Sequence, residues 1–484
     1  MRRVLGRKLR RDLGRHWRQF FAVALMAALS SLCYIGLEGA WHGLEVSLDR
    51  FAADTDLADA WVQGRAIDQD QLEQIRALPG VVDADAARQV WAEDVSSERR
   101  YMRLEAVPSG SLSRPQIVEG EPLTDDAAGG VWIDPAYAQA NDIAVGDEVK
   151  LQVSGETLRL TVRGLALSPE EVYFTGTPAL GAPEPDHYGY GYTTTDTLGA
   201  SAPANLVRVA GQTDAVADAA PAILGGDYVA VQTRASRASV ATAFDRVAQI
   251  KNLSYLFSGL FILLALLAMF TAIRRLVAMQ RPEIAALQAL GFSKRQIQSH
   301  YLAFGLVTGG AGTVLGAAAA PGISLFVLET QKTMFALPDW SIAYTPLAAA
   351  VAALIITACA ASALFALAAP LQLNPAEGLR QSIGRARHVA AERAGAIWGR
   401  LGPAARWALR DALLSRVRFA MGIVSVVGCM MLLFAGFGVS DSMYNQVEQV
   451  FNVERSHTQR IALAAGADGL PEGTQLLQDV AVRL

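Results

Sequence analysis

Five long apolar stretches, separated by charged segments, constrain this chain more than any other feature of its sequence. A membrane-spanning helix needs about 20 mostly apolar residues. The stretches cover residues 20–39, 253–273, 300–328, 345–370 and 419–440. Hydrophobic residues make up 52% of the 484 residues and charged residues only 18%, which is too apolar for an ordinary soluble protein of this length. The sequence therefore predicts an α-helical polytopic membrane protein with about five spans.

Charge is segregated along the chain in a way that the net charge of −4 hides. Residues 1–18 contain eight lysines and arginines against one acid, whereas residues 40–250 contain 15 basic and 32 acidic residues. Residues 371–418 contain nine arginines against three acids. Because basic loops stay in the cytoplasm, we expect cytoplasmic segments at 1–19, 274–299 and 371–418. The segments at 40–252, 329–344 and 441–484 then lie outside, and the N-terminus is cytoplasmic.

The first apolar stretch has an alternative interpretation as a secretory signal peptide, because a basic segment precedes it. Its apolar run is long for that role, and no clear small-x-small cleavage site follows. An amphipathic pattern continues directly after it. These features favour a first membrane span.

The large segment at 40–252 begins and ends with amphipathic helix patterns. Apolar residues recur at helical spacing after the first span and again before the second. We expect the two helices to pair as a stalk beneath an extracytoplasmic domain. The stalk residues are Leu44, Leu48 and Phe51, followed by Val240, Phe244 and Val247.

Between the stalk helices the pattern is that of an α/β domain. Helices are predicted at 71–78 and 135–141, and an irregular excursion at 168–192. Strands are predicted at 100–107, 130–133, 148–153 and 157–165.

No catalytic or metal-binding motif is found in the chain. The histidines of the domain, His42 and His187, have no HExxH spacing, and no GxSxG sequence occurs. Cys33, Cys359 and Cys429 all lie in apolar stretches, which argues against redox or metal chemistry. A membrane-bound enzyme is therefore disfavoured.

The third span contains four glycines with two GxxxG spacings, which let helix backbones approach closely. Packing within the chain is one interpretation, and an interface with a second permease is the other. The glycines are Gly305, Gly309, Gly312 and Gly316.

The segment 274–299 predicts a short helix at the cytoplasmic face. Pro282 and Glu283 suit its first turn, and Gly291 suits the position after its last turn. A second short helix is predicted from Ser293. Ile284, Leu287 and Leu290 form one apolar edge. Such a helix either docks into a partner groove or lies on the lipid interface, and periodicity does not distinguish the two.

This segment resembles the coupling helix of FtsX-like and MacB-like ABC transporter permeases, which follows the pattern Arg-x-Glu-Ile-(small)-x-Leu-x-Ala-Leu-Gly-x-Ser-x-x-x-Ile. The matches are Arg281, Glu283, Ile284, Leu287, Ala289, Leu290, Gly291, Ser293 and Ile297. Residues 374–380 resemble the Pro-x-Glu-x-Leu-Arg element of that family. Residues 117–123, 131–151 and 160–173 are similar to the MacB-like periplasmic domain.

The resemblance implies a non-catalytic subunit of the bacterial plasma (inner) membrane that contacts an ABC ATPase. No GxxxxGK[ST] phosphate loop occurs in the chain, so ATP and Mg²⁺ are expected on a partner ATPase, acting as a dimer, and no cofactor on this chain. A second permease copy or half and a periplasmic adaptor are further implied partners, and no nucleic acid is expected. The implied ATPase contacts are Arg281, Glu283, Ile284, Leu287, Leu290, Gly291, Phe292 and Arg295.

The resemblance favours an ABC transporter permease that couples ATP hydrolysis to movement of the extracytoplasmic domain. The spans contain almost no charge, which favours mechanical transmission, or export or extraction of a lipid-like, peptide or drug substrate, over a solute channel. The alternative is an FtsX-like protein that controls an extracytoplasmic partner.

Two segments resemble each other, residues 11–20 and 410–419, each followed by an apolar stretch. Arg11, Asp12 and Phe20 match Arg410, Asp411 and Phe419. We expect a duplicated permease in which residues 441–484 begin a second outside segment, so that the second half is incomplete.

Overall fold

The computed structural model describes residues 2–368 except 96–99, 109, 126, 154, 177–182 and 200–201, together with single residues between 402 and 445. The chain divides into two compact units. The helical unit contains Met1–Glu38, Asn252–Ile323 and Tyr344–Leu484. The sheet unit contains Gly39–Lys251 and Ser324–Ala343.

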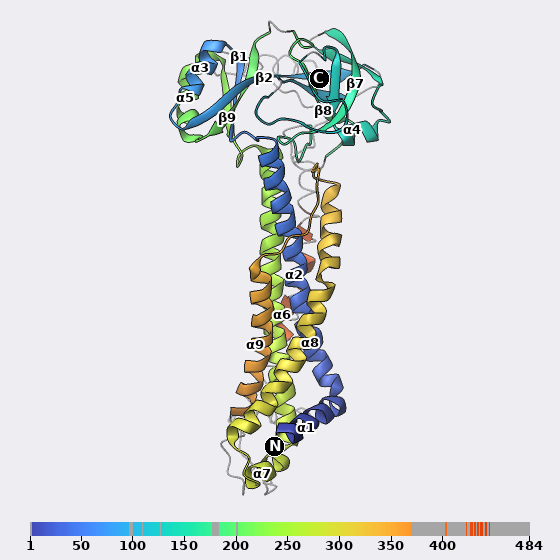
Figure 1. Cartoon of the computed structure of the whole chain (residues 1–484), viewed down its shortest axis with the longest axis vertical. Helices are drawn as coiled ribbons and strands as arrows, with labels where there is room; N and C mark the ends of the chain where they lie inside the picture. Colours follow the sequence, from blue (N-terminus) through green and yellow to red (C-terminus); the bar gives the residue numbers. More distant parts are fainter. Residues whose placement is uncertain are drawn as a thin grey trace. The chain divides into compact units, whose positions relative to one another are not determined.

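Four helices in the described residues are long and apolar enough to cross a membrane (Figure 1). They are α2 (Trp17–Asp54), α6 (Ala238–Met279), α8 (Lys294–Lys332) and α9 (Pro346–Ala368). The first four predicted spans are therefore confirmed as helices. The fifth, at 419–440, and the second copy of the repeat lie for the most part outside the described residues.

The helical unit has an apolar core to which α1 (Arg2–Arg15) and α7 (Arg281–Ala289) also contribute. Phe20 of α2 stacks on Phe304 of α8 with ring centroids 5.0 Å apart. Hydroxyls connect neighbouring helices, since Ser31 Oγ donates to the Thr313 carbonyl at 3.0 Å. Ser362 Oγ donates to the Leu266 carbonyl at 2.7 Å.

The four glycines of α8 face helices of the same chain. A Cβ on Gly305 would meet the Cα of Ala360 in α9 at 2.8 Å, and one on Gly309 would meet the Cβ of Cys359 at the same distance. Cβ atoms on Gly312 and Gly316 would overlap carbonyl oxygens of α2. Close approach of α8 to both neighbours therefore depends on the missing side chains.

The sheet unit is built on a ten-stranded sheet with the order β10-β1-β9-β2-β3-β8-β5-β7-β4, in which β6 pairs with β2 and β7. Most pairs are antiparallel, while β3·β8 and β5·β7 are parallel. The strands are β1 (Ala60–Ile67), β2 (Val81–Asp94), β3 (Tyr101–Ala106), β4 (Gln116–Gly120), β5 (Gly130–Ile133), β6 (Glu148–Val153), β7 (Glu156–Leu167), β8 (Tyr188–Thr193), β9 (Ala204–Gly211) and β10 (Tyr228–Thr233).

Strand β2 joins two lobes of the sheet unit. Its first half pairs with β9, and its second half pairs with β3. In one lobe α3 (Gln69–Arg76) and α5 (Asp214–Leu224) cover a core that includes Ile75 and Val207. In the other, α4 (Pro135–Ala140) adds Tyr137 to the core, and Figure 1 shows α4 near β7 and β8.

The sequence predicted four of the ten strands, β3, β5, β6 and β7, and did not predict β1, β2, β4, β8, β9, β10 or the helix α5. Predicted helices at 71–78 and 135–141 and strands at 130–133 and 148–153 coincide closely with α3, α4, β5 and β6. The predicted excursion at 168–192 is wrong at its end, because β8 lies between β3 and β5. Its alternating glycines, Gly189 and Gly191, face Tyr137 and Met102 so closely that larger residues would collide, which places Tyr190 and Tyr192 on the other face.

Helices α2 and α6 are longer than an apolar span requires, and their ends belong to the sheet unit. These ends contain the residues predicted for the stalk. Leu44, Leu48, Phe51, Val240 and Val247 are buried, and Phe244 is partly buried. Leu48 and Phe51 of α2 line one apolar pocket together with Val240 and Phe244 of α6. The Lys251 ammonium lies 4.6 Å from the ring centroid of Trp41, which adds a cation–π contact between the helices.

Candidate functional site

The residues at both ends of the short helix α7 explain where it begins and where it ends. Pro282 and Glu283 occupy its first turn, where a missing amide proton and an acidic side chain both fit. Gly291 has a φ of +85°, a conformation that side chains disfavour, and it follows the helix end at Leu290. The amides of Gly291 and Phe292 then bond to the Gln288 and Leu287 carbonyls at 3.0 Å.

The predicted second short helix from Ser293 is wrong in its length. Ser293 and Gln296 form a reciprocal cap, with their side chains bonding each other's backbone amides at 3.3 and 3.0 Å. The helix that starts here is α8, which continues to Lys332 although it contains several glycines and Pro321. Its apolar composition makes it long enough to cross a membrane, where the helix satisfies its own backbone hydrogen bonds.

The apolar edge of α7 is divided between the core and solvent. Ile284 is buried in the core of the helical unit, and Leu287 and Phe292 pack partly against that core. Leu290 is 73% exposed. Of the predicted ATPase contacts, Glu283, Leu290, Gly291 and Arg295 are exposed, and the side chain of Arg281 lies outside the described residues.

A polar junction connects α7 to α1 and α8. Lys8 of α1 forms ion pairs with Glu283 of α7 and, at 3.3 Å, with Asp12. The Gln280 side chain donates to Asp12 at 3.0 Å and accepts from the Tyr301 hydroxyl at 2.7 Å. We refer to Lys8, Asp12, Gln280, Glu283 and Tyr301 as the α1–α7 junction.

The junction is mostly enclosed. Asp12, Gln280 and Tyr301 are buried, whereas the Glu283 side chain is 57% exposed. The sequence marked Glu283, but Asp12 and Gln280 were missed as partners because their contact joins residues 268 positions apart. A lone acid among eight basic residues was the only available signal.

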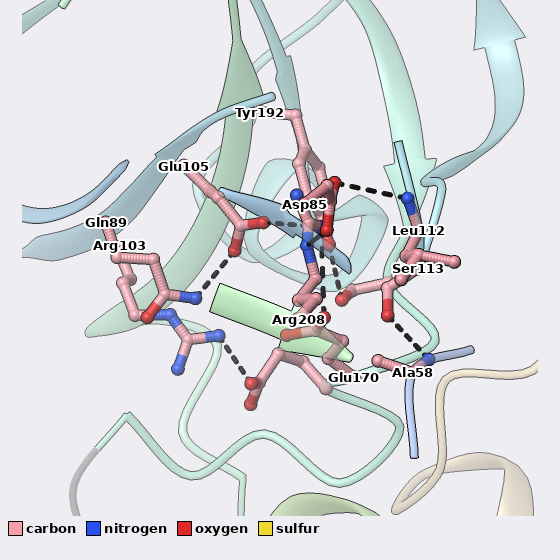
Figure 2. A network of polar contacts seen from close by, with 12 residues as sticks. Ala58, Asp85, Gln89, Arg103, Glu105, Leu112, Ser113, Glu170, Tyr192 and Arg208 are labelled. Carbon is pink, nitrogen blue, oxygen red and sulfur yellow. Dashed lines mark hydrogen bonds and ion pairs between the residues drawn. The ribbon is translucent and has the colours of Figure 1, made fainter. Parts of the chain in front are cut away.

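The sheet unit contains a second polar group of a different kind, the buried ion cluster. Its centre is Arg208 of β9, which is fully buried and lies 3.2 Å from Asp85 of β2 and 2.9 Å from Glu105 of β3 (Figure 2). Glu170, in the segment after β7, lies 3.8 Å from Arg208 and 2.9 Å from Arg237. The remaining members are Glu171 and Arg103, which pair at 2.6 Å.

Opposing charges fix the ionisation of the cluster. Burial would lower the pKa of Arg208, but the Glu105, Asp85 and Glu170 carboxylates raise it overall. Burial also disfavours ionised Glu170, yet Arg237 and Arg208 outweigh this and lower its pKa. The pKa values of Glu105 and Asp85 remain raised by burial, which Arg208 offsets only in part.

The cluster holds the segment after β7 against the start of α6. The Ser239 hydroxyl donates to the Glu170 carbonyl at 2.6 Å, and the Tyr173 amide donates to the Ser239 carbonyl at 3.1 Å. The Ala336 amide, in the α8–α9 connection, donates to the Val172 carbonyl at 2.9 Å. This cluster was not predicted, although Arg208, a charged residue within the apolar run Leu206–Val209, was a signal for it in the sequence.

None of these arrangements is a catalytic or metal centre of a recognisable kind. In the part of the chain that the structure describes, no group of three or more His, Cys, Asp or Glu side chains could hold a metal ion. The polar groups described above instead join elements that are far apart in the sequence.

Comparison with protein families gives a match to the helices that contain α7 and its neighbours. Residues 255–368, from within α6 to the end of α9, match the family model described as FtsX-like permease C-terminal. This part of the chain, which is less than half of its length, is similar to the C-terminal domain of FtsX-like permeases. FtsX-like permeases are non-catalytic membrane subunits of ABC transporters and generally work with an ABC ATPase. This match and the four long apolar helices together indicate a membrane protein. Helix α7 and the glycines of α8 lie inside the matched region.

Among solved structures, the chain is similar to the extracellular domain of the noncanonic ABC-type transporter YknZ from Gram-positive bacteria, with 12% identity and a TM-score of 0.25. That similarity covers 36% of this chain and 98% of the other. The comparison with curated proteins gave no match.

Proposed function

We propose that this FtsX-like permease receives movement from a separate ABC ATPase at α7 and passes it to the sheet unit outside the cytoplasm. The observation that supports the proposal is the exposure of Leu290 at the end of α7. Leu290 is 73% exposed, whereas Ile284, Leu287 and Phe292 pack with the core of the helical unit. An exposed leucine on a rigid helix end is suited to a groove on a partner protein. ATP and Mg²⁺ would bind on that partner.

The attachment of α7 supports transmission rather than passive anchoring. Ile284 fixes one side of α7 in the core, and the α1–α7 junction fixes its start to α1 and α8. A force on Leu290 would therefore displace the beginning of a span together with α7. The long helices α2 and α6 continue from the helical unit into the sheet unit, so their movement would reach the sheets.

The composition of the described spans favours mechanical work over conduction of a polar solute. Several buried hydroxyls of these helices donate to carbonyls of neighbouring or preceding turns. The buried carboxylate of Glu38 is an exception among these polar groups, and it accepts hydrogen bonds from the hydroxyl and amide of Thr345. We propose a lipid-like, peptide or drug substrate for export or extraction, or an outside partner that is moved.

Photocrosslinking tests the partner at α7. A photoreactive amino acid at position 290 of the full-length chain, in native membranes, should capture a protein that carries a GxxxxGK[ST] motif. The same amino acid at position 82, where Val82 of the sheet unit is 83% exposed, should not capture it. Capture of that protein only from position 82, or from neither position, would contradict the proposal.

Loss of coupling provides the second arm. With the captured ATPase co-reconstituted, Leu290→Asp should lower the stimulation of ATP hydrolysis about ten-fold, because a desolvated apolar anchor contributes roughly 1–3 kcal/mol. Val82→Asp is the control and should leave the stimulation unchanged. Leu287→Asp is less informative, because Leu287 also packs against the core.

A further inference from the structure

Helix α1 has two faces of opposite chemistry. One face packs against the other helices of the helical unit. On this face Leu9 and Leu13 contact the apolar core, and Asp12 is buried. The other face is exposed and carries only arginines among its charged residues. We call the exposed arginines of α1 and the first turn of α2 the arginine stripe: Arg7, Arg10, Arg11, Arg15 and Arg18.

The spacing and pairing of these residues separate the stripe from the rest of α1. Arg7, Arg11 and Arg15 follow each other at intervals of four residues, so they lie on one side of the helix. The only acid of the segment, Asp12, faces inward and pairs with Lys8 and Gln280. Within the described part of the chain, no arginine of the stripe forms an ion pair.

The stripe ends where the first apolar span begins. Trp17 and Phe21 are 57% and 58% exposed, and the Arg18 guanidinium lies 5.9 Å from the Trp17 ring centroid. Exposed tryptophan and arginine beside the end of an apolar helix are typical of the boundary between lipid headgroups and acyl chains. This places the stripe at headgroup level.

We propose that the arginine stripe binds the phosphate groups of anionic phospholipids in the membrane leaflet next to α1. Guanidinium groups form paired hydrogen bonds with phosphate. Lys8, the one lysine in the sequence of α1, instead forms ion pairs with Asp12 and Glu283. The apolar face of α1 is already packed, so the stripe holds the helix to the lipid by charge rather than by insertion. This binding does not depend on the ATPase contact at α7.

Lipid retention by the full-length chain tests the proposal without any activity assay. The chain is reconstituted in vesicles of equal parts phosphatidylglycerol and phosphatidylcholine, extracted in mild detergent, and the retained lipids are counted by native mass spectrometry. The wild-type chain should retain phosphatidylglycerol preferentially. Arg7→Gln/Arg11→Gln/Arg15→Gln should lower that preference by about five-fold per arginine, roughly a hundred-fold if the three act independently.

A matched variant separates the stripe from net charge. Arg114→Gln/Arg159→Gln/Arg163→Gln removes three exposed arginines from the sheet unit and should leave the preference unchanged. Arg7→Lys/Arg11→Lys/Arg15→Lys keeps the charge and should retain most of it. Thermal unfolding of each variant checks that the fold is intact.

Several results would overturn the proposal. The first is that the wild-type chain shows no preference for phosphatidylglycerol. The second is that the glutamine variant of the stripe retains as much phosphatidylglycerol as the wild type. The third is that the sheet-unit variant or the lysine variant loses as much of the preference as the glutamine variant does. Full competition by millimolar inorganic phosphate would assign the stripe to a soluble anion instead. A glutamine variant that keeps its lipid preference but loses the crosslink from position 290 would assign the stripe to an acidic protein surface.

Discussion

The sheet unit and the helical unit are each stabilised internally by a different kind of interaction. The sheet unit encloses a fully buried arginine and its carboxylates. The buried polar side chains of the helical unit are mostly hydroxyls, apart from the α1–α7 junction, Glu38 and His300. In lipid, helices gain little from hiding apolar surface, so they depend on close contact at small residues. A domain folded in water can fix several loops with buried charges, provided that each has a partner.

This contrast predicts that removal of a buried charge destabilises the sheet unit most. It also predicts that a larger side chain at a buried glycine destabilises the helical unit most. The largest effect is expected for Arg208→Met, which leaves Asp85, Glu105 and Glu170 buried without their central cation. The free energy of unfolding of the sheet unit should fall by about 3–5 kcal/mol. Urea unfolding of the full-length chain in detergent, followed by the fluorescence of buried Trp61 and Trp132, measures it.

Arg159→Met is the control for this change, because Arg159 is 71% exposed and lies 3.9 Å from Glu148. It should alter stability by less than about 0.5 kcal/mol. Similar losses for the two variants would remove the distinction between the buried cluster and the surface.

An isolated buried carboxyl sharpens the comparison. Asp134 caps α4 and accepts from the Ala136 amide at 3.0 Å, and no ion pair to it is found among the described residues. Burial raises its pKa to about 6, against 3.8 for an exposed aspartate. The folded state therefore binds its proton more tightly, and its contribution to stability, full below pH about 4, is lost as the pH rises through about 6.

Asp134→Asn should keep the cap and raise stability at pH 7 by up to about 2–3 kcal/mol. The difference between variant and wild type should shrink as the pH falls toward 4, which isolates Asp134 from Glu105 and Asp85. Unfolding curves at several pH values measure this. A constant difference across that range would refute the assigned pKa.

Gain of volume tests the helical unit. Gly312→Val would place side-chain atoms against the backbone of α2, where a Cβ alone would approach the Ala27 Cβ to 2.9 Å. A loss of about 1–3 kcal/mol is expected from overpacking. Gly310→Val is the control, since nothing lies within 4 Å of a Cβ there. Thermal unfolding in detergent should rank Gly312→Val well below Gly310→Val.

The smallest effect is expected at the α1–α7 junction. Glu283→Gln removes one exposed partner of Lys8, which keeps its contact with Asp12 at 3.3 Å. Stability should change by less than about 1 kcal/mol, as for other surface pairs. Glu329→Gln, which breaks the exposed pair with Lys332, is the reference. A loss of several kcal/mol for Glu283→Gln alone would place the junction in the same class as the buried cluster.

Prediction from sequence succeeded where structure depends on neighbouring residues. The end of α7 at Gly291 follows from backbone conformation alone. Strand β8 was missed because its alternating glycines and tyrosines resemble a loop, and only pairing with β3, more than 80 residues earlier, makes it a strand. The split of the α7 edge into buried Ile284 and exposed Leu290 was also missed, since it depends on which helices pack nearby.

The sequence by itself determined the apolar spans, the mixed character of the large segment, α7 and its termination, because hydropathy, period and turn chemistry are local properties. The tertiary structure decided the order of the strands, the partners of Arg208, the contacts of the α8 glycines and the inward turn of Asp12. Those features join residues far apart in the chain, and which partners meet is set by the packing of the whole unit.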